Sequence, residues 1–388
     1  MTTTVTVFTD RTDSSAAGRH LGSQLQEVLG EQSPDAVLVF ASSRFEFGPL
    51  LEALDAACRP KVLVGSSSAG EFTANQRGTG TACALAIRSD EIKVTAGIGF
   101  GVGSDRAQAA RDVVASFRGL SMPELPYRAA LVMTDALAGH ADDLVEQLTL
   151  LTSGKYQFAG GGAGDDARFT QTHVFLGVKA YTDAVVALEL LSTKPMGIGV
   201  GHGWVPAGPQ LRVTEAIGAT LVSLNGFPAA DAFAAHAAAT GQAFDREAPL
   251  PFFLHNVLGI DTGAGYRLRV PLGITADGSV SCAAEVPTGA QVYIMRTTSE
   301  SAITAAANAT DAAIRAIGDE KPGVAIFFDC VATRLRMGDV FGFELDAVAR
   351  SLGGARLVGC NTYGQIARAN GQFGGFHNCT AVVMVLPA

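Results

Sequence analysis

The chain has 388 residues, of which 48% are hydrophobic and 17% are charged, and its net charge is −9. This length predicts two or three domains with a sizeable core, and the composition excludes a disordered chain. The acidic balance is unlike the basic face of a nucleic-acid-binding protein, so we expect no nucleic-acid partner. No apolar run approaches the roughly 18 residues that a membrane-spanning helix needs, and the first residues lack a signal-peptide pattern. We therefore expect a cytoplasmic protein without membrane insertion.

Three segments of the chain repeat one pattern: an apolar strand, a variable stretch, a second apolar strand and a glycine-rich turn. The copies lie at residues 36–72, 129–166 and 324–366. A strand and an amphipathic helix are predicted before each copy, with the helices at 16–30, 105–118 and 301–315. Each copy therefore predicts a module in the order strand, helix, strand, short helix, strand, glycine turn, strand.

The order of elements in each module also predicts how its strands pair. Helical crossovers favour parallel pairing with right-handed connections. The strands after the turns, at 81–87, 173–178 and 379–386, follow short links and are predicted to be antiparallel. We expect an α/β fold in which internally repeated modules form mixed sheets covered by helices.

Two modules are predicted to fill an N-terminal domain at 1–205, and the third belongs to a C-terminal domain at 206–388. The boundary is the stretch 204–210, which is rich in proline and glycine. The segment that follows it predicts strands at 211–216 and 266–274 and a helix at about 228–240. Two further segments, 97–103 and 197–203, have glycine at every second position. Such a strand lets either another backbone or a ligand approach closely.

The three glycine turns are the candidate ligand site. Turns at the carboxyl ends of strands expose N–H groups that can bind an anion, and acidic side chains near their ends suit an ammonium group. This combination indicates a small zwitterion such as an amino acid. The alternative is that the turns only need positive φ angles and close packing. The predicted ligand-binding residues of the turns are Gly65, Ser66, Ser67, Ser68, Gly70, Glu71, Gly161, Gly162, Asp165, Asn361, Thr362, Tyr363 and Gln365.

The third module adds further candidates. Arg334 suits a carboxylate clamp, and Cys330 is either a packed side chain, a ligand-lining or redox-sensing thiol, or a nucleophile activated by Arg334 or His377. Asn378 either caps a turn or touches the ligand. We assign no catalytic residue, no cofactor and no metal ion. Among the six cysteines no spacing is typical of a zinc site or a disulfide framework, and the chain has no P-loop motif.

Several motifs together resemble the FIST family over nearly the whole chain, as an N-terminal FIST domain followed by a FIST C-domain. They include GSSSAGEF (65–72), GGGAGDD (160–166), PFFLHNVLGI (251–260), IFFDCVATR (326–334) and GCNTYGQIA…FHNCT (359–379). The resemblance implies an intracellular sensory module of signal transduction whose proposed stimulus is a small ligand, amino acids in particular. It implies a stand-alone sensor here, because no kinase, cyclase or F-box segment is appended. The family usually has Glu at the position of Gln365, so a role that needs this acid is in doubt here.

The leading hypothesis is therefore a sensor whose ligand lies where the turns of the two domains converge, with downstream signalling proteins as partners. Ligand binding would close the domains on each other by shifting a pre-existing equilibrium. Two alternatives stay open. One is an enzyme that uses Cys330 as nucleophile, or Asp165 and Asp166 as acid–base or metal carboxylates. The other is a scaffold that binds a protein.

Overall fold

A computed structural model describes residues 2–369 and 375–388 and shows three similar modules, each built around a mixed sheet. The first contains β1 (Thr2–Thr9), α1 (Ser14–Leu29), β2 (Ala36–Ser42), α2 (Phe47–Cys58), β3 (Val62–Ser68) and β6 (Ala82–Ser89). The second contains β7 (Ile92–Phe100), α3 (Arg106–Val114), β8 (Tyr127–Thr134), α4 (Ala141–Leu151), β9 (Gln157–Gly162) and β12 (Ala184–Ser192). The third contains β13 (Gly197–Gly201), α7 (Ser299–Ala316), β23 (Pro322–Cys330), α8 (Val331–Met337), α9 (Phe341–Ser351), β24 (Arg356–Thr362) and β27 (Ala381–Pro387).

The strands of the three modules follow one order, β1-β6-β2-β3, β7-β12-β8-β9 and β13-β27-β23-β24. The two strands joined by a helical crossover, such as β2 and β3, are parallel, and the last strand of each module is antiparallel to its neighbours. The prediction of repeated modules with mixed sheets covered by helices is confirmed.

Each sheet is completed by a hairpin from another module. The hairpin β4 (Glu71–Thr73) and β5 (Arg77–Gly78) of the first module pairs with β24 of the third. The hairpin β10 (Val174–Leu176) and β11 (Lys179–Tyr181) of the second pairs with β3 of the first. The hairpin β25 (Gln365–Arg368) and β26 (Gly375–His377) of the third pairs with β9 of the second. The three modules thus exchange hairpins in a closed cycle.

This exchange changes the place of one predicted strand. Residues 173–178 were predicted to follow the second turn as an antiparallel strand, and β10 is antiparallel. It joins the first module's sheet, however, and β12 is the strand that returns to the second module's own sheet. The reason is the turn itself, because the chain leaves β9 toward the first module, and Ser67 then accepts a hydrogen bond from His173 N (2.9 Å).

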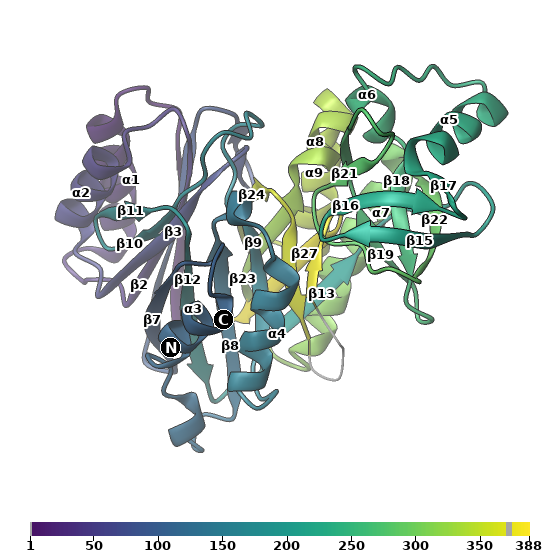
Figure 1. The fold of residues 1–388 in the computed structure, drawn as a ribbon. Coiled ribbons are helices and arrows are strands. Elements are labelled where there is room, and N and C mark those ends of the chain that lie inside the picture. Colours follow the sequence, from purple (N-terminus) through teal and green to yellow (C-terminus); the bar gives the residue numbers. More distant parts are fainter. Residues whose placement is uncertain (1, 370–374) are drawn as a thin grey trace.

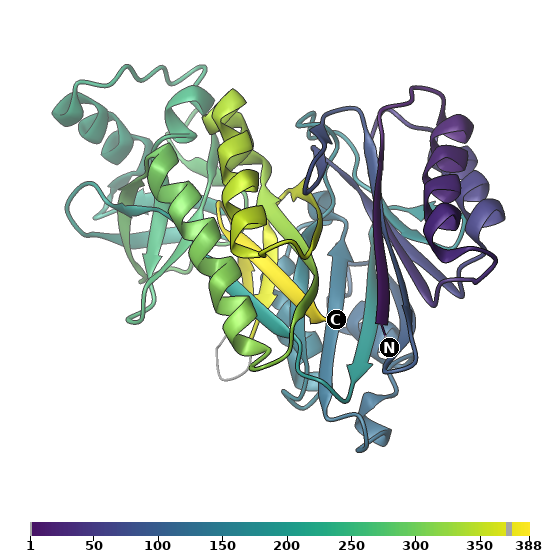
Figure 2. The same cartoon turned by 180° about the vertical axis from the view of Figure 1, so that it is seen from behind.

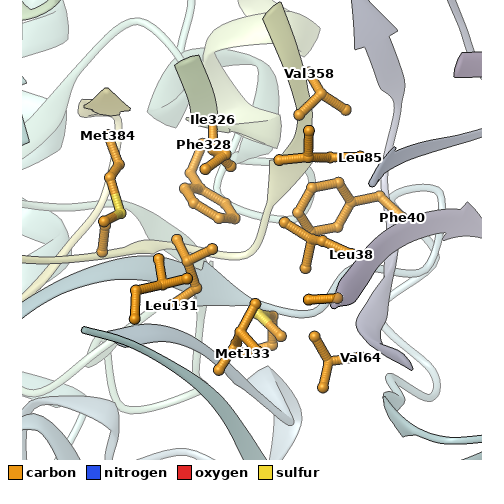
Figure 3. Close-up of a cluster of buried hydrophobic side chains, with 14 of the residues drawn as sticks. Leu38, Phe40, Val64, Leu85, Leu131, Met133, Ile326, Phe328, Val358 and Met384 are labelled. Carbon is orange, nitrogen blue, oxygen red and sulfur yellow. The ribbon is translucent and has the colours of Figure 1, made fainter. Parts of the chain in front are cut away.

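The inner faces of the three sheets share one hydrophobic core, and the helices cover the outer faces (Figures 1 and 2). The close-up in Figure 3 shows Phe40 of the first sheet, Leu131 and Met133 of the second, and Ile326 and Phe328 of the third around the same space. Burial of this apolar surface is the main force that holds the modules together. The outer faces are covered by α1 and α2, by α3 and α4, and by α7 and α9.

The two strands with alternating glycines pack directly against helix backbones. A Cβ atom added to Gly99 of β7 would lie 2.0 Å from Ala109 O of α3, and one added to Gly199 of β13 would lie 1.8 Å from Ala309 O of α7. The glycines therefore serve close packing by a helix, which was one of the two predicted explanations. β13 also pairs with β27, so this strand opens the third module.

A nine-stranded antiparallel sheet is inserted between β13 and α7, and it lies beside the third module in Figure 1. Its strands are β14 (Val205–Pro206), β15 (Leu211–Ile217), β16 (Thr220–Leu224), β17 (Phe227–Pro228), β18 (Val257–Asp261), β19 (Tyr266–Arg269), β20 (Pro271–Ile274), β21 (Val280–Cys282) and β22 (Gln291–Arg296). The helices α5 (Ala229–Thr240) and α6 (Leu250–Phe253) accompany it. The predicted strand at 211–216 and the helix at 228–240 are confirmed, whereas the strand predicted at 266–274 is divided into β19 and β20. The predicted domain boundary at 205/206 stays a prediction.

One predicted helix is shorter in the structure than the sequence suggested. The helix predicted at 105–118 ends at Val114, because the chain turns to place the N–H groups of Arg118 and Gly119 on the carboxylate of Glu189 (2.9 and 3.0 Å). None of the helices in the described residues has both the length and the apolar character that crossing a bilayer requires.

Candidate functional site

The three glycine turns meet, although they are far apart in the sequence. Backbone hydrogen bonds join every pair of turns: Ala69 N to Asn361 O (2.9 Å), Gly164 N to Ser67 O (3.0 Å) and Tyr363 N to Gly162 O (2.9 Å). These N–H groups are therefore satisfied by protein carbonyls. An anion at this point would have to be bound mainly by side chains.

The predicted glycines of the turns allow close contacts between strands. A Cβ atom on Gly65 would lie 1.8 Å from Val39 O of the neighbouring strand. One on Gly161 or Gly162 would lie 2.8 Å from a carbonyl of the third turn. Real Cβ atoms are excluded at such distances. Gly65 is therefore needed for the close approach of β3 to β2, and Gly161 and Gly162 for the contact of the second turn with the third.

The serines of the first turn are buried and largely occupied by protein contacts. Ser66 lies within β3, between Phe40 of β2 and Val174 of β10. Ser67 holds β10 through its hydrogen bond from His173 N (2.9 Å). Neither side chain is presented to solvent.

Glu71 is a buried carboxyl group with protein donors on both oxygens. Ser68 Oγ donates to Glu71 Oε1 (2.6 Å), and Thr81 donates to Oε2 through its N–H (3.2 Å) and its hydroxyl (2.6 Å). Burial nevertheless raises the pKa of Glu71 to about 7, and these hydrogen bonds offset only part of that effect. Glu71 thus supports the first turn and titrates near neutral pH.

Four residues from all three turns and α8 form what we call the axial polar cluster: Gly70, Asp166, Arg334 and Asn361. A Cβ atom on Gly70 would lie 2.7 Å from Asn361 Oδ1 and 3.3 Å from Arg334 Nε, so these side chains converge on the glycine. Both amide atoms of Asn361, Arg334 Nε and Asp166 Oδ1 are buried, yet none has a hydrogen-bond partner within the described part of the chain. Buried polar atoms are normally satisfied, so these four atoms mark the place where a bound polar group would find partners.

Asp166 is held in place by two serines that the sequence analysis did not single out. Its Oδ2 accepts hydrogen bonds from Ser42 Oγ (2.8 Å) and Ser43 N (2.9 Å), which leaves Oδ1 free. Asp166 has φ +58, in the left-handed region that non-glycine residues rarely adopt. The sequence could have indicated these serines, because they lie at the carboxyl end of β2, and open α/β sheets bind ligands at that edge.

Asp165, by contrast, is fully engaged within the protein. It accepts hydrogen bonds from Phe169 N (2.8 Å), Thr170 N (2.6 Å), Gln171 N (2.9 Å) and the Tyr363 hydroxyl. Burial alone would raise its pKa, but the bonds from Tyr363 and the backbone outweigh it and hold the pKa below the ordinary value. Asp165 therefore anchors the loop as a carboxylate.

Thr362 and Gln365 connect the third turn to its own module. Thr362 Oγ1 donates to Asp329 O (3.3 Å), and the side-chain amide of Gln365 lies 2.9 Å from the same hydroxyl. Both residues are buried. Gln365 is thus a buried residue whose side chain supports Thr362.

A pocket of about 80 Å³ lies between the second module, the third module and the nine-stranded sheet. Its walls are mostly apolar, and they include Leu137, Phe169 and Leu272, with Cys330, Tyr363 and Asn378 as the polar or reactive side chains. We call it the apolar pocket. Three of the sequence-predicted site residues therefore line one cavity.

The rings of Tyr363 and Phe169 form one wall of the apolar pocket. They stack with centroids 4.4 Å apart and an angle of 13° between their planes. Asn378 accepts a long hydrogen bond from Val270 N (3.4 Å), which ties the third module to the inserted sheet. The pocket is therefore bounded by side chains that also fix the contact between these parts of the molecule.

Cys330 has an unusual environment for a buried thiol. The thiol of Cys379 donates a hydrogen bond to it, and N–H groups of Cys379 and Ala332 add to this effect. Although burial opposes the change, these donors lower the pKa of Cys330 to about 6. The sequence hypothesis named Arg334 or His377 as the activating group. His377 is neutral instead, because burial lowers its pKa to about 4.

The structure thus separates the predicted site residues into three groups. Gly70, Arg334 and Asn361 converge on the axial polar cluster, which also contains Asp166. Cys330, Tyr363 and Asn378 line the apolar pocket. The other predicted residues support strand and turn packing: Gly65, Ser66, Ser67, Ser68, Glu71, Gly161, Gly162, Asp165, Thr362 and Gln365. Over residues 2–369 and 375–388, no three His, Cys, Asp or Glu side chains are placed to hold a metal ion.

Comparison with known proteins extends the sequence resemblance. The FIST N domain matches residues 35–226, and the FIST C domain matches residues 229–368. No curated protein matches the chain. Among solved structures, cyanuric acid hydrolase from A. caulinodans is 9% identical, with full coverage of both chains and a TM-score of 0.37. T. maritima PurL complexed with FGAR is 11% identical, with all of this chain and 73% of that chain covered and a TM-score of 0.25.

The structural likenesses are too weak to carry an argument about fold or function, whereas the two family matches together span most of the chain. The motifs at the glycine turns predicted this assignment, and it is confirmed. The chain therefore belongs to the FIST family, whose domains are generally ligand-binding modules of sensing and signal transduction.

Proposed function

We propose that this protein is a sensor for a small ligand that has a carboxylate head group and an apolar body, such as an apolar amino acid or a related metabolite. The observation that carries the proposal is the set of unpaired buried atoms in the axial polar cluster: Arg334 Nε, both amide atoms of Asn361 and Asp166 Oδ1. Leaving such atoms unpaired costs about 1–3 kcal/mol each. A ligand that satisfies them gains that free energy on binding.

The chemistry of the cluster suits a zwitterion. The guanidinium of Arg334 and the Asn361 NH₂ group are donors for a carboxylate, and a guanidinium binds a carboxylate in bidentate fashion. The Asp166 carboxylate and the Asn361 carbonyl oxygen are acceptors for an ammonium group. Burial lowers the pKa of Arg334, but the nearby carboxyl groups of Glu71 and Asp166 favour its charged form, so it stays a cation.

Tyr363 links this cluster to the apolar pocket. It lines the pocket and lies close enough to Arg334 to affect that group's charge. In the proposed complex the head group lies at the axial polar cluster and the apolar body extends past Tyr363 toward Leu137 and Leu272. The pocket of about 80 Å³ limits that body to a few carbon atoms.

Signal output would follow from the position of the pocket, whose walls come from the second module, the third module and the inserted sheet. A ligand that contacts all three favours the arrangement in which they are closest and shifts the population toward it. A downstream signalling protein would recognise that state. We place this activity in the cytoplasm, because all six cysteines are free thiols, as expected in a reducing compartment.

Isothermal titration calorimetry with the common amino acids and their 2-keto acids tests the proposal. We expect one class to bind, and Arg334→Ala and Asn361→Ala each to weaken it at least about tenfold, which corresponds to about 1.4 kcal/mol. Arg334→Lys should recover little, because an ammonium lacks the bidentate geometry. Arg111→Ala is the control, since Arg111 lies on the exposed face of α3. Wild-type affinity in both Arg334→Ala and Asn361→Ala would refute the site.

A protein-binding scaffold is the main competing function. Affinity capture of partners with and without the bound ligand separates the two, because a sensor changes its partners with ligand and a scaffold does not.

A further inference from the structure

Cys330 and Cys379 are adjacent thiols at the end of the third sheet. Strands β23 and β27 are antiparallel, and their last paired residues at this end are Phe328 and Val382. Cys330 is the last residue of β23, and Cys379 lies two residues before β27 begins, so the two cysteines flank the same end of this strand pair. The register, continued past that pair, sets Cys330 opposite Thr380, the chain neighbour of Cys379, and both cysteines belong to one buried cluster.

The two thiols differ in environment. Cys330 accepts the hydrogen bond from the Cys379 thiol, so its thiolate is stabilised, whereas Cys379 keeps its proton because this bond and burial raise its pKa. Cys379 has φ +48, a left-handed conformation that is rare for a residue other than glycine. Strained conformations of this kind persist where the surrounding structure enforces them, often at functional sites.

Only one thiol of the pair faces the apolar pocket. Cys330 lines that pocket, while Cys379 faces a separate cavity of about 10 Å³ beside Asp329 and Arg336. One water needs about 10–15 Å³ of such space, so the pocket of about 80 Å³ admits a molecule somewhat larger than water. A small oxidant therefore reaches the more nucleophilic sulfur first.

We propose that Cys330 is an oxidation site for small hydroperoxides and that Cys379 resolves the product into an intramolecular disulfide. The sulfur of the Cys330 thiolate attacks a peroxide oxygen, so an S–O bond forms and the O–O bond breaks. The leaving oxygen takes up the proton that Cys330 released and departs as an alcohol or as water. The Cys379 sulfur then displaces hydroxide from Cys330, and the hydroxide leaves as water with the Cys379 proton. Two thiols are oxidised and one peroxide is reduced.

The chain contains a matched pair of thiols for comparison. Cys83 and Cys360 are also buried, and Cys83 is close enough to affect the ionisation of Cys360. Burial raises the pKa of both, and neither lines the apolar pocket. They therefore test whether proximity of two cysteines is sufficient, or whether the lowered pKa and the pocket are required.

The test treats the full-length folded protein with hydrogen peroxide, blocks remaining thiols and maps tryptic peptides. The proposal expects the loss of two thiols per chain and a reducible link between peptides 316–334 and 369–388, each of which contains one cysteine. Cys330 should react at least about tenfold faster than Cys83 or Cys360. In Cys379→Ser, Cys330 should stop at the sulfenic acid, which dimedone traps, without a peptide link.

Three results would overturn the proposal: an unreacted Cys330, equal rates at the Cys83–Cys360 pair, or a linked peptide in Cys379→Ser. The wild-type mapping needs no variant, so a folding defect in Cys379→Ser would not obscure it. The outcome is also independent of ligand binding at the axial polar cluster, because the assay contains no ligand other than the peroxide.

Discussion

Asp142→Ala tests how the nine-stranded sheet is attached to the second module. Asp142 of α4 forms an ion pair with Arg269, whose side chain is 1% exposed, and lies 3.5 Å from Arg267. Asp142 Oδ1 also accepts a hydrogen bond from Phe376 N (2.7 Å). The remaining bonds of the Arg269 guanidinium go to backbone carbonyls, including Glu285 O (2.8 Å), so they do not neutralise its charge.

The burial of the paired side chains determines how much stability each substitution should remove. Removal of one partner of a buried ion pair leaves the other charge unpaired and costs about 3–5 kcal/mol. Because Asp142 itself is 23% exposed, we expect the lower end, about 3 kcal/mol. Asp143→Ala is the control from the adjacent residue. Asp143 pairs with Arg106 at 2.8 Å but is 46% exposed, so its loss should cost less than about 1 kcal/mol.

Urea unfolding followed by tryptophan fluorescence measures both variants. Trp204 is the single tryptophan, and it is buried in the cluster between the inserted sheet and the third module, so its emission reports on this region. The free energy of unfolding should fall by about 3 kcal/mol in Asp142→Ala and hardly change in Asp143→Ala. Equal effects of the two substitutions would refute the argument from burial.

Two further predictions concern pH and packing. Burial raises the pKa of Glu71 from its ordinary value of 4.5 to about 7, and the pKa of Glu344 to about 7 as well. Folding therefore favours the protonated form of both acids. Their contribution to the free energy of unfolding is complete below pH 4.5 and is lost as the pH rises toward 7, and for Glu71 it amounts to about 3 kcal/mol. Glu71→Gln should flatten this part of the stability curve, measured by urea unfolding at several pH values, and an unchanged slope would contradict the assigned cause. Gly199→Ala should lower the free energy of unfolding by about 1–3 kcal/mol or more, because its Cβ would meet a carbonyl of α7. Gly48→Ala is the control and should not destabilise the protein, because no atom lies within 4 Å of the added Cβ. Similar denaturation midpoints for the two variants would rule out the contact.

The modular architecture was predictable because it depends on patterns that are local in the sequence. Helical periods, apolar strands and glycine turns recur in each copy, and crossovers dictate parallel pairing. The exchange of hairpins was not predictable. The hairpin strands have two to four residues, and so short a strand pairs equally well by its own pattern with any free edge. Packing of the whole core decides which edge it joins.

The candidate site could also be predicted only where it depends on local sequence patterns. Arg334 and Asn361 could be named from the sequence because each lies at or just after the carboxyl end of a strand that the repeat defines. Ser42 and Ser43 escaped notice, since their role depends on Asp166, more than a hundred residues away in the chain. The contact between Cys330 and Cys379 likewise depends on the register of β23 with β27, which no local pattern encodes.

The cyclic exchange of hairpins has a consequence for biosynthesis. A nascent polypeptide that has reached only the end of the second module has the hairpin β4–β5 without β24 to receive it, and β9 without β25. Such unpaired edges invite association with other chains. We therefore expect incomplete chains to be prone to association, and fragments cut at the module boundaries to aggregate rather than fold.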